Sequence, residues 1–334
     1  MTIKNSLLAA IGWVTLLTAC GSSGNRFRLE GEFKNMNQAE LYLYNAADGR
    51  KDTIHVQRGR FIYETDLKDT ATLMVMFPNY SQIPVFATSG ITAKMKGDAS
   101  QLREIKVKGS KQNDEMTAFR LKANQLTPPE MTEIAAEYIT EEPNSPVSFY
   151  LLQQYFMKAL EPDYRRAMLL CNTMLQANPQ NRAVLQLKHD LRPLTAGSKG
   201  SRMPMFALLD TKGRVVTNRQ MQKKVNVVCL WATWNYESRA QLSTLRKLVK
   251  ENPGKISALG ISIDATAGEG RDWTRRDSVN FPLVCDGKMW QTPMAQALGM
   301  NDLPTNIVTD EKGIIVERDI PNKEMQKRLQ ELMK

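Results

Sequence analysis

Residues 225–234 read VNVVCLWATW, an almost unbroken apolar run. A strand of this composition has to be covered on both faces, as the central strands of α/β sheets are. Around it, strand-like and helix-like segments alternate up to residue 334. They comprise a hairpin at 203–216, helices at 237–252, 270–280 and 322–334, a second apolar strand at 255–264, and a hairpin at 304–320. Residues 203–334 are therefore predicted to form an α/β domain with the order β-α-β-α-β-β-α.

Two regions with other periodicities precede this domain. Residues 20–110 contain short alternating runs such as AELYLYN and DTIHVQRGRFIYETDL, and are predicted to form an antiparallel, β-sandwich-like domain. Residues 111–195 change to a helical spacing of apolar side chains and are predicted to be a helical segment. A chain of 334 residues is long enough for several cores, so we expect a multidomain protein.

The N-terminus has the pattern of an export signal. Lys4 supplies a positive start, and residues 7–18 are apolar over a length too short to span a bilayer comfortably. The segment Leu17-Thr18-Ala19-Cys20 resembles the bacterial lipobox, which implies a cleaved signal peptide at residues 1–19 and an acylated Cys20. The protein is then expected to be lipid-anchored in the cell envelope, on the periplasmic face of the outer membrane. An ordinary secretory signal with a chance cysteine is the alternative.

Composition argues against several classes of function. The net charge of +10 is a modest bias for this length, and an exported protein is not expected to bind nucleic acid. The two histidines, His55 and His189, lie far apart in the sequence, so we expect no metal site of the Cys/His type. Gly268 and Gly270 lack the spacing of a dinucleotide-binding loop, and we expect no cofactor.

Three cysteines remain if Cys20 carries lipid. Cys171 lies among apolar residues of a predicted helix and Cys229 lies in the predicted central strand, so both are expected to be buried. Cys285 ends a strand-like run and is expected to be more exposed. Cys229 and Cys285 are the candidate reactive thiols. A disulfide between them would need Cα atoms within about 7 Å.

The C-terminal domain resembles thioredoxin-like domains of the TlpA/ResA type, which are related to the alkyl hydroperoxide reductase and thiol-specific antioxidant group. Trp231-Ala232-Thr233-Trp234 matches the segment before their W-C-x-x-C motif, and Leu303-Pro304-Thr305 matches their loop with a cis proline. The N-terminal pieces LEGEF, DTIHVQRGRF and IKVKGSKQND resemble a β-domain of unknown function that precedes such domains in bacterial envelope lipoproteins. The resemblance implies a thioredoxin fold.

The chain differs from this family at the positions that carry the redox chemistry. The attacking cysteine falls on Asn235, the resolving cysteine falls on Ser238, and a buried aspartate found in many members falls on Cys229. Dithiol exchange needs one thiolate that attacks and a second thiol that releases the mixed disulfide. An amide and a hydroxyl can do neither, so the domain is expected to be redox-inactive.

The replacements suit a helix start beside a binding surface. Asn235 is a favourable N-cap, and Glu237 places its charge in the field of the helix N-terminus. Trp234 and Tyr236 would leave an aromatic surface beside Pro304, which in this fold implies binding of extended peptide. The residues predicted to form this degenerate site are Trp231, Trp234, Asn235, Tyr236, Glu237, Ser238, Leu303, Pro304 and Thr305.

Three functions follow from these observations. The first is binding of a peptide or an envelope-protein partner, without enzyme activity. The second is a thiol-disulfide or peroxide-related oxidoreductase that uses a relocated thiol, Cys285 or Cys229. The third is a structural role in assembly, with no ligand in the groove.

Overall fold

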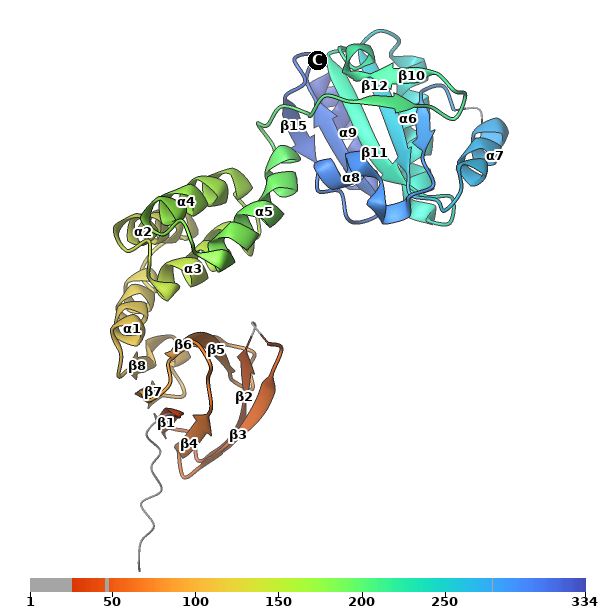
Figure 1. The fold of residues 1–334 in the computed structure, drawn as a ribbon. Helices are drawn as coiled ribbons and strands as arrows, with labels where there is room; N and C mark the ends of the chain where they lie inside the picture. Colours follow the sequence, from red (N-terminus) through yellow and green to blue (C-terminus); the bar gives the residue numbers. More distant parts are fainter. Residues whose placement is uncertain (1–25, 46–47, 278) are drawn as a thin grey trace, which may run out of the picture. The chain divides into compact units, whose positions relative to one another are not determined.

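The computed structural model describes residues 26–45, 48–277 and 279–334. The predicted signal peptide and Cys20 lie outside these residues. The chain divides into two compact units, one that ends at Thr127 and one that spans Pro128–Lys334 (Figure 1).

The first unit is built on a sheet of eight strands with the order β6-β5-β2-β3-β4-β1-β7-β8. The strands are β1 (Phe27–Lys34), β2 (Gln38–Asn45), β3 (Lys51–Gln57), β4 (Arg60–Thr65), β5 (Ala71–Met76), β6 (Gln82–Ala87), β7 (Thr92–Asp98) and β8 (Lys106–Lys108). Neighbouring strands pair antiparallel, except that β1 runs parallel to β7. The predicted N-terminal β-rich domain is confirmed, with this one parallel pair as a correction.

Alternation along the strands builds the core of this unit. In β1, Phe27, Leu29 and Phe33 point inward and are buried. Phe33 also lies 5.8 Å, centroid to centroid, from the ring of Phe77, which directly follows β5. Three strands separate β1 from β5 in the sheet, so this contact requires the sheet to bend over its own core.

Helix α1 (Lys111–Ala123) joins the two edges of the bent sheet. The Asn113 side chain accepts a hydrogen bond from Phe86 N and donates one to Phe86 O, both at 2.9 Å, on edge strand β6. One turn later, Thr117 Oγ1 accepts from Val107 N at 3.0 Å and donates to Val107 O at 2.7 Å, on edge strand β8. Both edge strands thereby gain hydrogen-bond partners for backbone groups that stay unpaired at the edges of an open sheet. The first helix of the predicted 111–195 segment is thus grouped with the β-strands.

The second unit begins with a helical region. It contains α2 (Pro128–Glu141), α3 (Pro146–Leu152), a π-helical turn η2 (Gln153–Met157), α4 (Tyr164–Ala177) and α5 (Arg182–Ala196). Ser145, Asp163 and Asn181 cap α3, α4 and α5 through their side-chain oxygens. The helical middle of the chain is confirmed.

The rest of the second unit is an α/β domain on a sheet of order β13-β12-β11-β14-β15. Its elements are the hairpin β9 (Ala207–Leu209) and β10 (Val215–Thr217), β11 (Val225–Trp231), α6 (Tyr236–Glu251), β12 (Ile256–Ser262), α7 (Ala267–Asp277), β13 (Leu283–Cys285), α8 (Pro293–Ala297), β14 (Thr305–Thr309), β15 (Ile315–Arg318) and α9 (Asn322–Leu332). The predicted order is confirmed. The strand-like run that ends at Cys285 forms β13, and the structure adds the five-residue helix α8, which is too short to produce a period in the sequence.

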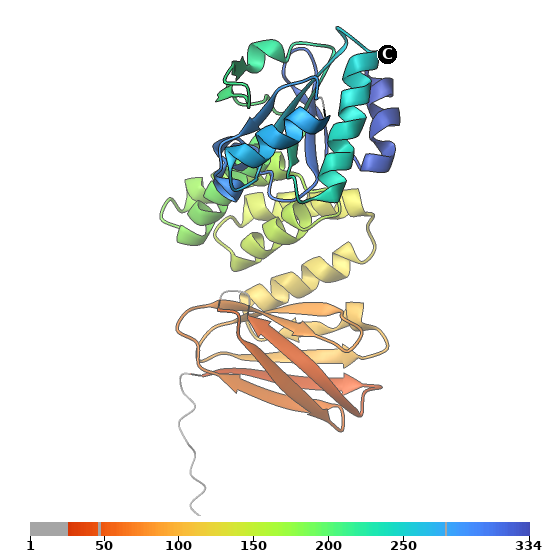
Figure 2. The same ribbon diagram turned by 90° about the vertical axis from the view of Figure 1, so that its right-hand side faces the viewer.

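β11 is the central strand of this sheet, as its composition predicts. All seven of its residues are buried, between β12 in parallel and β14 in antiparallel orientation. One face of the sheet packs on α6 and α9, which lie side by side in Figure 2, and the other face packs on α8 and the β9–β10 hairpin. The carboxyl end of β11 and the start of α6 therefore lie at one edge of a rigid sheet.

Candidate functional site at the start of α6

The junction from β11 to α6 is closed by local hydrogen bonds. Asn235 is the N-cap of α6, and its Oδ1 accepts from Ser238 N at 2.8 Å, as predicted for an N-cap. Ser238 is fully buried, and its Oγ accepts from Ala232 N at 3.2 Å and donates to Asn235 O at 3.0 Å. The two side chains thus fix the turn that leads into the helix.

Glu237 also takes part in packing at this junction. It lies in the first turn of α6, and the Asn322 side chain donates to its Oε2 at 2.9 Å and to its main-chain oxygen at 2.8 Å. Asn322 is the first residue of α9. Glu237 therefore both meets the positive end of the helix dipole and joins α6 to α9.

The loop before β14 reaches this junction through the sheet register. Thr305, the first residue of β14, pairs with Leu230 of β11, and the Leu303–Pro304 peptide bond is cis. Leu303 and Pro304 are half-buried and Thr305 is buried. The structure thus brings the carboxyl end of β11 next to the first residue of β14, although the two are more than sixty residues apart in sequence.

The predicted aromatic residues have different environments. Trp234 is 62% exposed and Tyr236 is 71% exposed, at the end of the β11–α6 loop and the start of α6. Trp231 is fully buried, and its ring centroid lies 4.8 Å from that of Trp273 in α7. Trp234 and Tyr236 can therefore meet a ligand, whereas Trp231 belongs to the core.

Two of the three described cysteines are core residues. Cys229 is fully buried in β11, its Sγ donates to Leu259 O at 3.6 Å, and burial raises its pKa to about 12. Cys171 is fully buried in α4, and burial raises its pKa to about 11. A buried thiol with a raised pKa is a poor nucleophile, because the thiolate is the reactive form.

Cys285 is the half-buried thiol. It ends β13, and its Sγ donates to Thr266 O at 3.3 Å. The sheet register separates Cys285 from Cys229. Cys285 of β13 pairs with Ser262 of β12, and Ser262 in turn pairs with Trp231 of β11. Trp231 lies two residues beyond Cys229 in the same strand. Cys229 and Cys285 therefore lie two strands apart, about 10 Å, which is beyond the reach of a disulfide.

Asp264 is a part of the junction that sequence reasoning missed. It is fully buried after the end of β12, and its Oδ1 accepts from both Thr233 N and Thr233 Oγ1 at 2.9 Å. Its Oδ2 accepts from Ser262 Oγ at 2.6 Å. Asp264 thereby fixes the residue before Trp234. An aspartate at the carboxyl end of a strand parallel to β11 was the available signal, since such ends meet at one edge of the sheet.

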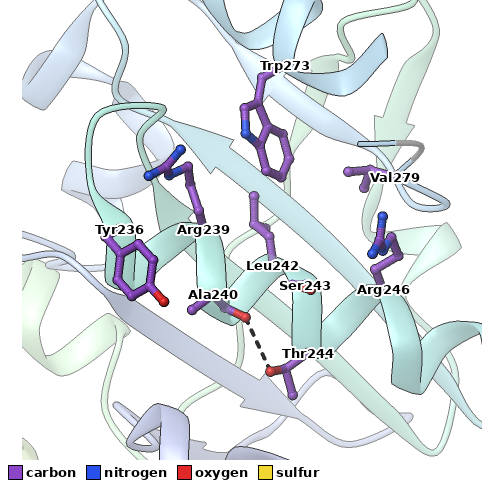
Figure 3. Close-up of a pocket in the computed structure, with 9 residues that line it drawn as sticks. All are labelled: Tyr236, Arg239, Ala240, Leu242, Ser243, Thr244, Arg246, Trp273 and Val279. Carbon is purple, nitrogen blue, oxygen red and sulfur yellow. Dashed lines mark hydrogen bonds between the residues drawn. The ribbon is translucent and has the colours of Figure 1, made fainter. Parts of the chain in front are cut away.

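A groove of about 450 Å³ begins at the junction and runs along α6, on the side where Trp273 of α7 lies (Figure 3). It was not predicted, because part of its wall comes from α7 and from the segment after it. The lining residues are Tyr236, Arg239, Ala240, Leu242, Ser243, Thr244, Arg246, Trp273 and Val279. Tyr236 thus belongs both to the predicted site and to the groove.

Two family models match the chain. Residues 199–318 match the AhpC/TSA family, and residues 27–116 match a domain of unknown function, DUF4369. The protein is thioredoxin-like, with an N-terminal DUF4369 domain. This agrees with the resemblance drawn from Trp231-Ala232-Thr233-Trp234 and Leu303-Pro304-Thr305.

Individual relatives match the C-terminal region of this thioredoxin-like protein. The thioredoxin-like protein YneN of Bacillus subtilis is 24% identical over 137 residues, which are 39% of this chain and 78% of the relative. The C-terminal domain of a putative thiol-disulfide oxidoreductase from Bacteroides thetaiotaomicron is 25% identical, over 41% of this chain and 97% of that structure, with a TM-score of 0.37. A thiol-disulfide oxidoreductase from Bacteroides fragilis is 26% identical, over 40% and 99%, also with a TM-score of 0.37.

The chemistry available to the thioredoxin-like domain follows from these positions. Asn235 and Ser238 cannot form a disulfide with each other or with a substrate. Among the described residues there is no group of three His, Cys, Asp or Glu side chains that could hold a metal ion. No helix within that part of the chain is long and apolar enough to cross a membrane. Hydrogen-bonding backbone and exposed aromatic rings remain at the start of α6.

Proposed function

We propose that this is a lipid-anchored cell-envelope protein whose thioredoxin-like domain binds extended peptide and does not carry out dithiol exchange. One observation carries the proposal: the turn into α6 is completed by Asn235 and Ser238 through hydrogen bonds, while Trp234 and Tyr236 beside it are exposed. The partner is an unfolded or extended segment of an envelope protein.

The geometry around β14 supports peptide binding. Thr305 pairs with Leu230, so the backbone of Leu303 and Pro304 lies near the end of β11, next to the loop that carries Trp234. An extended peptide binds such a site by main-chain hydrogen bonds, and aromatic rings add contact area at small cost in side-chain entropy. The junction is also rigid, because Asp264 holds Thr233 and Asn235 caps α6.

The proposed location rests on the N-terminal sequence. Leu17-Thr18-Ala19-Cys20 has the form of a lipobox, and acyl chains on Cys20 would hold the protein at the periplasmic face of the outer membrane. Metabolic labelling with an alkyne fatty acid tests this step. The wild type should take up label and Cys20→Ala should not. Label on the Cys20→Ala variant would contradict the assignment.

The binding proposal is tested on the soluble form, residues 21–334. Wild-type protein should capture a reduced, unfolded polypeptide such as carboxymethylated insulin B chain, and should not accelerate the reduction of insulin disulfides. The double variant Trp234→Ala/Tyr236→Ala should lose capture. Tyr80→Ala is the matched control, since Tyr80 is 81% exposed in the first unit. Full capture by the double variant would contradict the proposal.

The alternative function is a thiol oxidoreductase that acts through Cys285. Cys285 is the one thiol of the described residues that is not buried, and the matched relatives include proteins named as thiol-disulfide oxidoreductases. Insulin reduction by the wild type that is abolished in Cys285→Ser would establish it.

A further inference from the structure

The part of the groove along α6 that the structure describes is lined by positive and not by negative side chains. Of its nine described lining residues, Arg239 and Arg246 are basic and none is acidic. Figure 3 shows Arg239 next to Tyr236 at one end of the groove and Arg246 near Val279 at the other. The lining also includes the aromatic ring of Trp273. This combination suits a ligand that is anionic and partly apolar.

Arg239 is the residue with capacity left for a ligand. Its Nε is buried and has no hydrogen-bond partner among the described residues. The guanidinium carbon lies 6.0 Å from the centroid of the Tyr236 ring, so the aromatic face helps to hold the group in place. Because Nε is buried, a ligand can reach the guanidinium only at its Nη groups, and a carboxylate is the acceptor that fits these groups best.

The length of the groove indicates a peptide. Tyr236 and Arg246 are ten residues apart on one helix, which corresponds to about 15 Å at 1.5 Å per residue. An extended peptide covers the same distance with four or five residues at about 3.3 Å each. Because Tyr236 lies at both the groove and the proposed binding surface, one peptide can continue from the surface into the groove.

We propose that this groove selects acidic peptide segments, and that Arg239 binds an aspartate or glutamate side chain of the ligand through charge-assisted hydrogen bonds. This inference rests on the proposed function, since it names the kind of peptide that the same surface accepts. Tyr236 and Trp273 contact apolar side chains next to the carboxylate.

The test compares two peptides that differ in charge alone. The probes are the acetylated and amidated heptapeptide Gly-Phe-Asp-Phe-Asp-Phe-Gly and its twin with Asn at both Asp positions, so that no terminal carboxylate competes. Affinities are measured by fluorescence anisotropy on residues 21–334. The acidic peptide should bind about tenfold more tightly than its twin, the effect of one charge-assisted hydrogen bond. The difference should shrink as salt is added.

Variants of α6 assign the effect to Arg239. In Arg239→Gln the two peptides should bind equally, at the affinity that the wild type has for the Asn peptide. Arg239→Lys should keep part of the difference, since it retains charge but loses the planar fork. Lys247→Gln is the matched control: it removes the same charge from an exposed position of the same helix that does not line the groove.

The outcomes separate this inference from the proposed function. Equal binding of both peptides to the wild type overturns the selection of acidic segments and leaves peptide binding in place. A difference that persists in Arg239→Gln overturns the role of Arg239. Binding of neither peptide counts against the proposed function and the inference together. Unchanged affinity of Arg239→Gln for the Asn peptide shows that the variant is folded.

Discussion

Alkylation of the cysteines gives the sharpest test of whether thiol chemistry survives in this protein. The perturbation is unfolding: residues 21–334 are treated with iodoacetamide at pH 7.4, native and then in denaturant. At that pH a thiol of pKa 9 is ionised to about 2%, and one of pKa near 12 to about one part in 40,000. Cys229 should therefore react about a thousandfold more slowly in the native protein than after unfolding.

Burial slows Cys229 beyond the effect of its pKa. It lies in the central strand between β12 and β14, so reagent reaches it only when the sheet opens. Cys171, with a pKa near 11, should also be slow, by a factor of about one hundred from ionisation alone. Cys285 is half-buried and should react first of the three.

Mass spectrometry of the alkylated peptides follows each site separately. Slow native labelling of Cys229 and Cys171, which becomes fast in denaturant, is the expected result. Native labelling of Cys229 at the rate of the unfolded chain would refute the reasoning from burial. Fast labelling of Cys285 well above the unfolded rate would instead identify an activated thiol and favour the oxidoreductase alternative.

Three further predictions concern the two folding units. Asn113→Ala removes two buried hydrogen bonds to Phe86 and should lower the stability of the first unit by about 2–4 kcal/mol, measured by urea unfolding with faster hydrogen exchange at the Phe86 amide. Asn235→Ala removes the cap of α6 and should cost about 1 kcal/mol, measured as a lower urea midpoint of the second unit. Asp264→Ala releases Thr233 and should weaken peptide capture as well as stability, measured by anisotropy and thermal unfolding.

Each of these three changes has a control variant, which for Asn235 and Asp264 is a conservative substitution at the same position. Lys122→Ala alters an exposed position of α1 and should leave the exchange of the Phe86 amide unchanged. Asn235→Ser should retain most of the stability, because serine also accepts at the N-cap. Asp264→Asn should restore most of it, because the amide oxygen can still accept from Thr233. A conservative variant as damaging as its alanine partner would show that the named hydrogen bond is not the cause.

Local pattern was sufficient to predict most of the secondary structure. The apolar run at 225–234 became the fully buried β11, and the apolar spacing of residues 237–252 became α6, with Leu242, Leu245 and Leu248 in the core. Asn235 at the helix start was predicted from the capping chemistry of its side chain together with the resemblance to thioredoxin-like domains. These features depend on neighbours within a few residues, which is the range that sequence periodicity and capping rules cover.

The position of α1 shows where local pattern was insufficient. Its helical period was visible, but not its contacts with β6 and β8, through which Asn113 and Thr117 complete the two edges of one sheet. These partners lie ten or more residues away in sequence. Hydrogen bonds over such distances depend on how the sheet bends, which no local pattern encodes.

For the site at the start of α6, too, some properties were determined by the sequence and others only by the tertiary structure. By itself the sequence determined the chemical nature of the site: an amide and a hydroxyl at positions 235 and 238, two aromatic residues beside them, and two separate cysteines, Cys229 and Cys285, in the same domain. Only the tertiary structure decided that Trp231 is buried while Trp234 is exposed, that Asp264 supports the loop, and that Arg239 lines a groove. The physical reason is that residue type fixes which bonds a side chain can form, whereas packing of separate elements fixes which partners and how much solvent it meets.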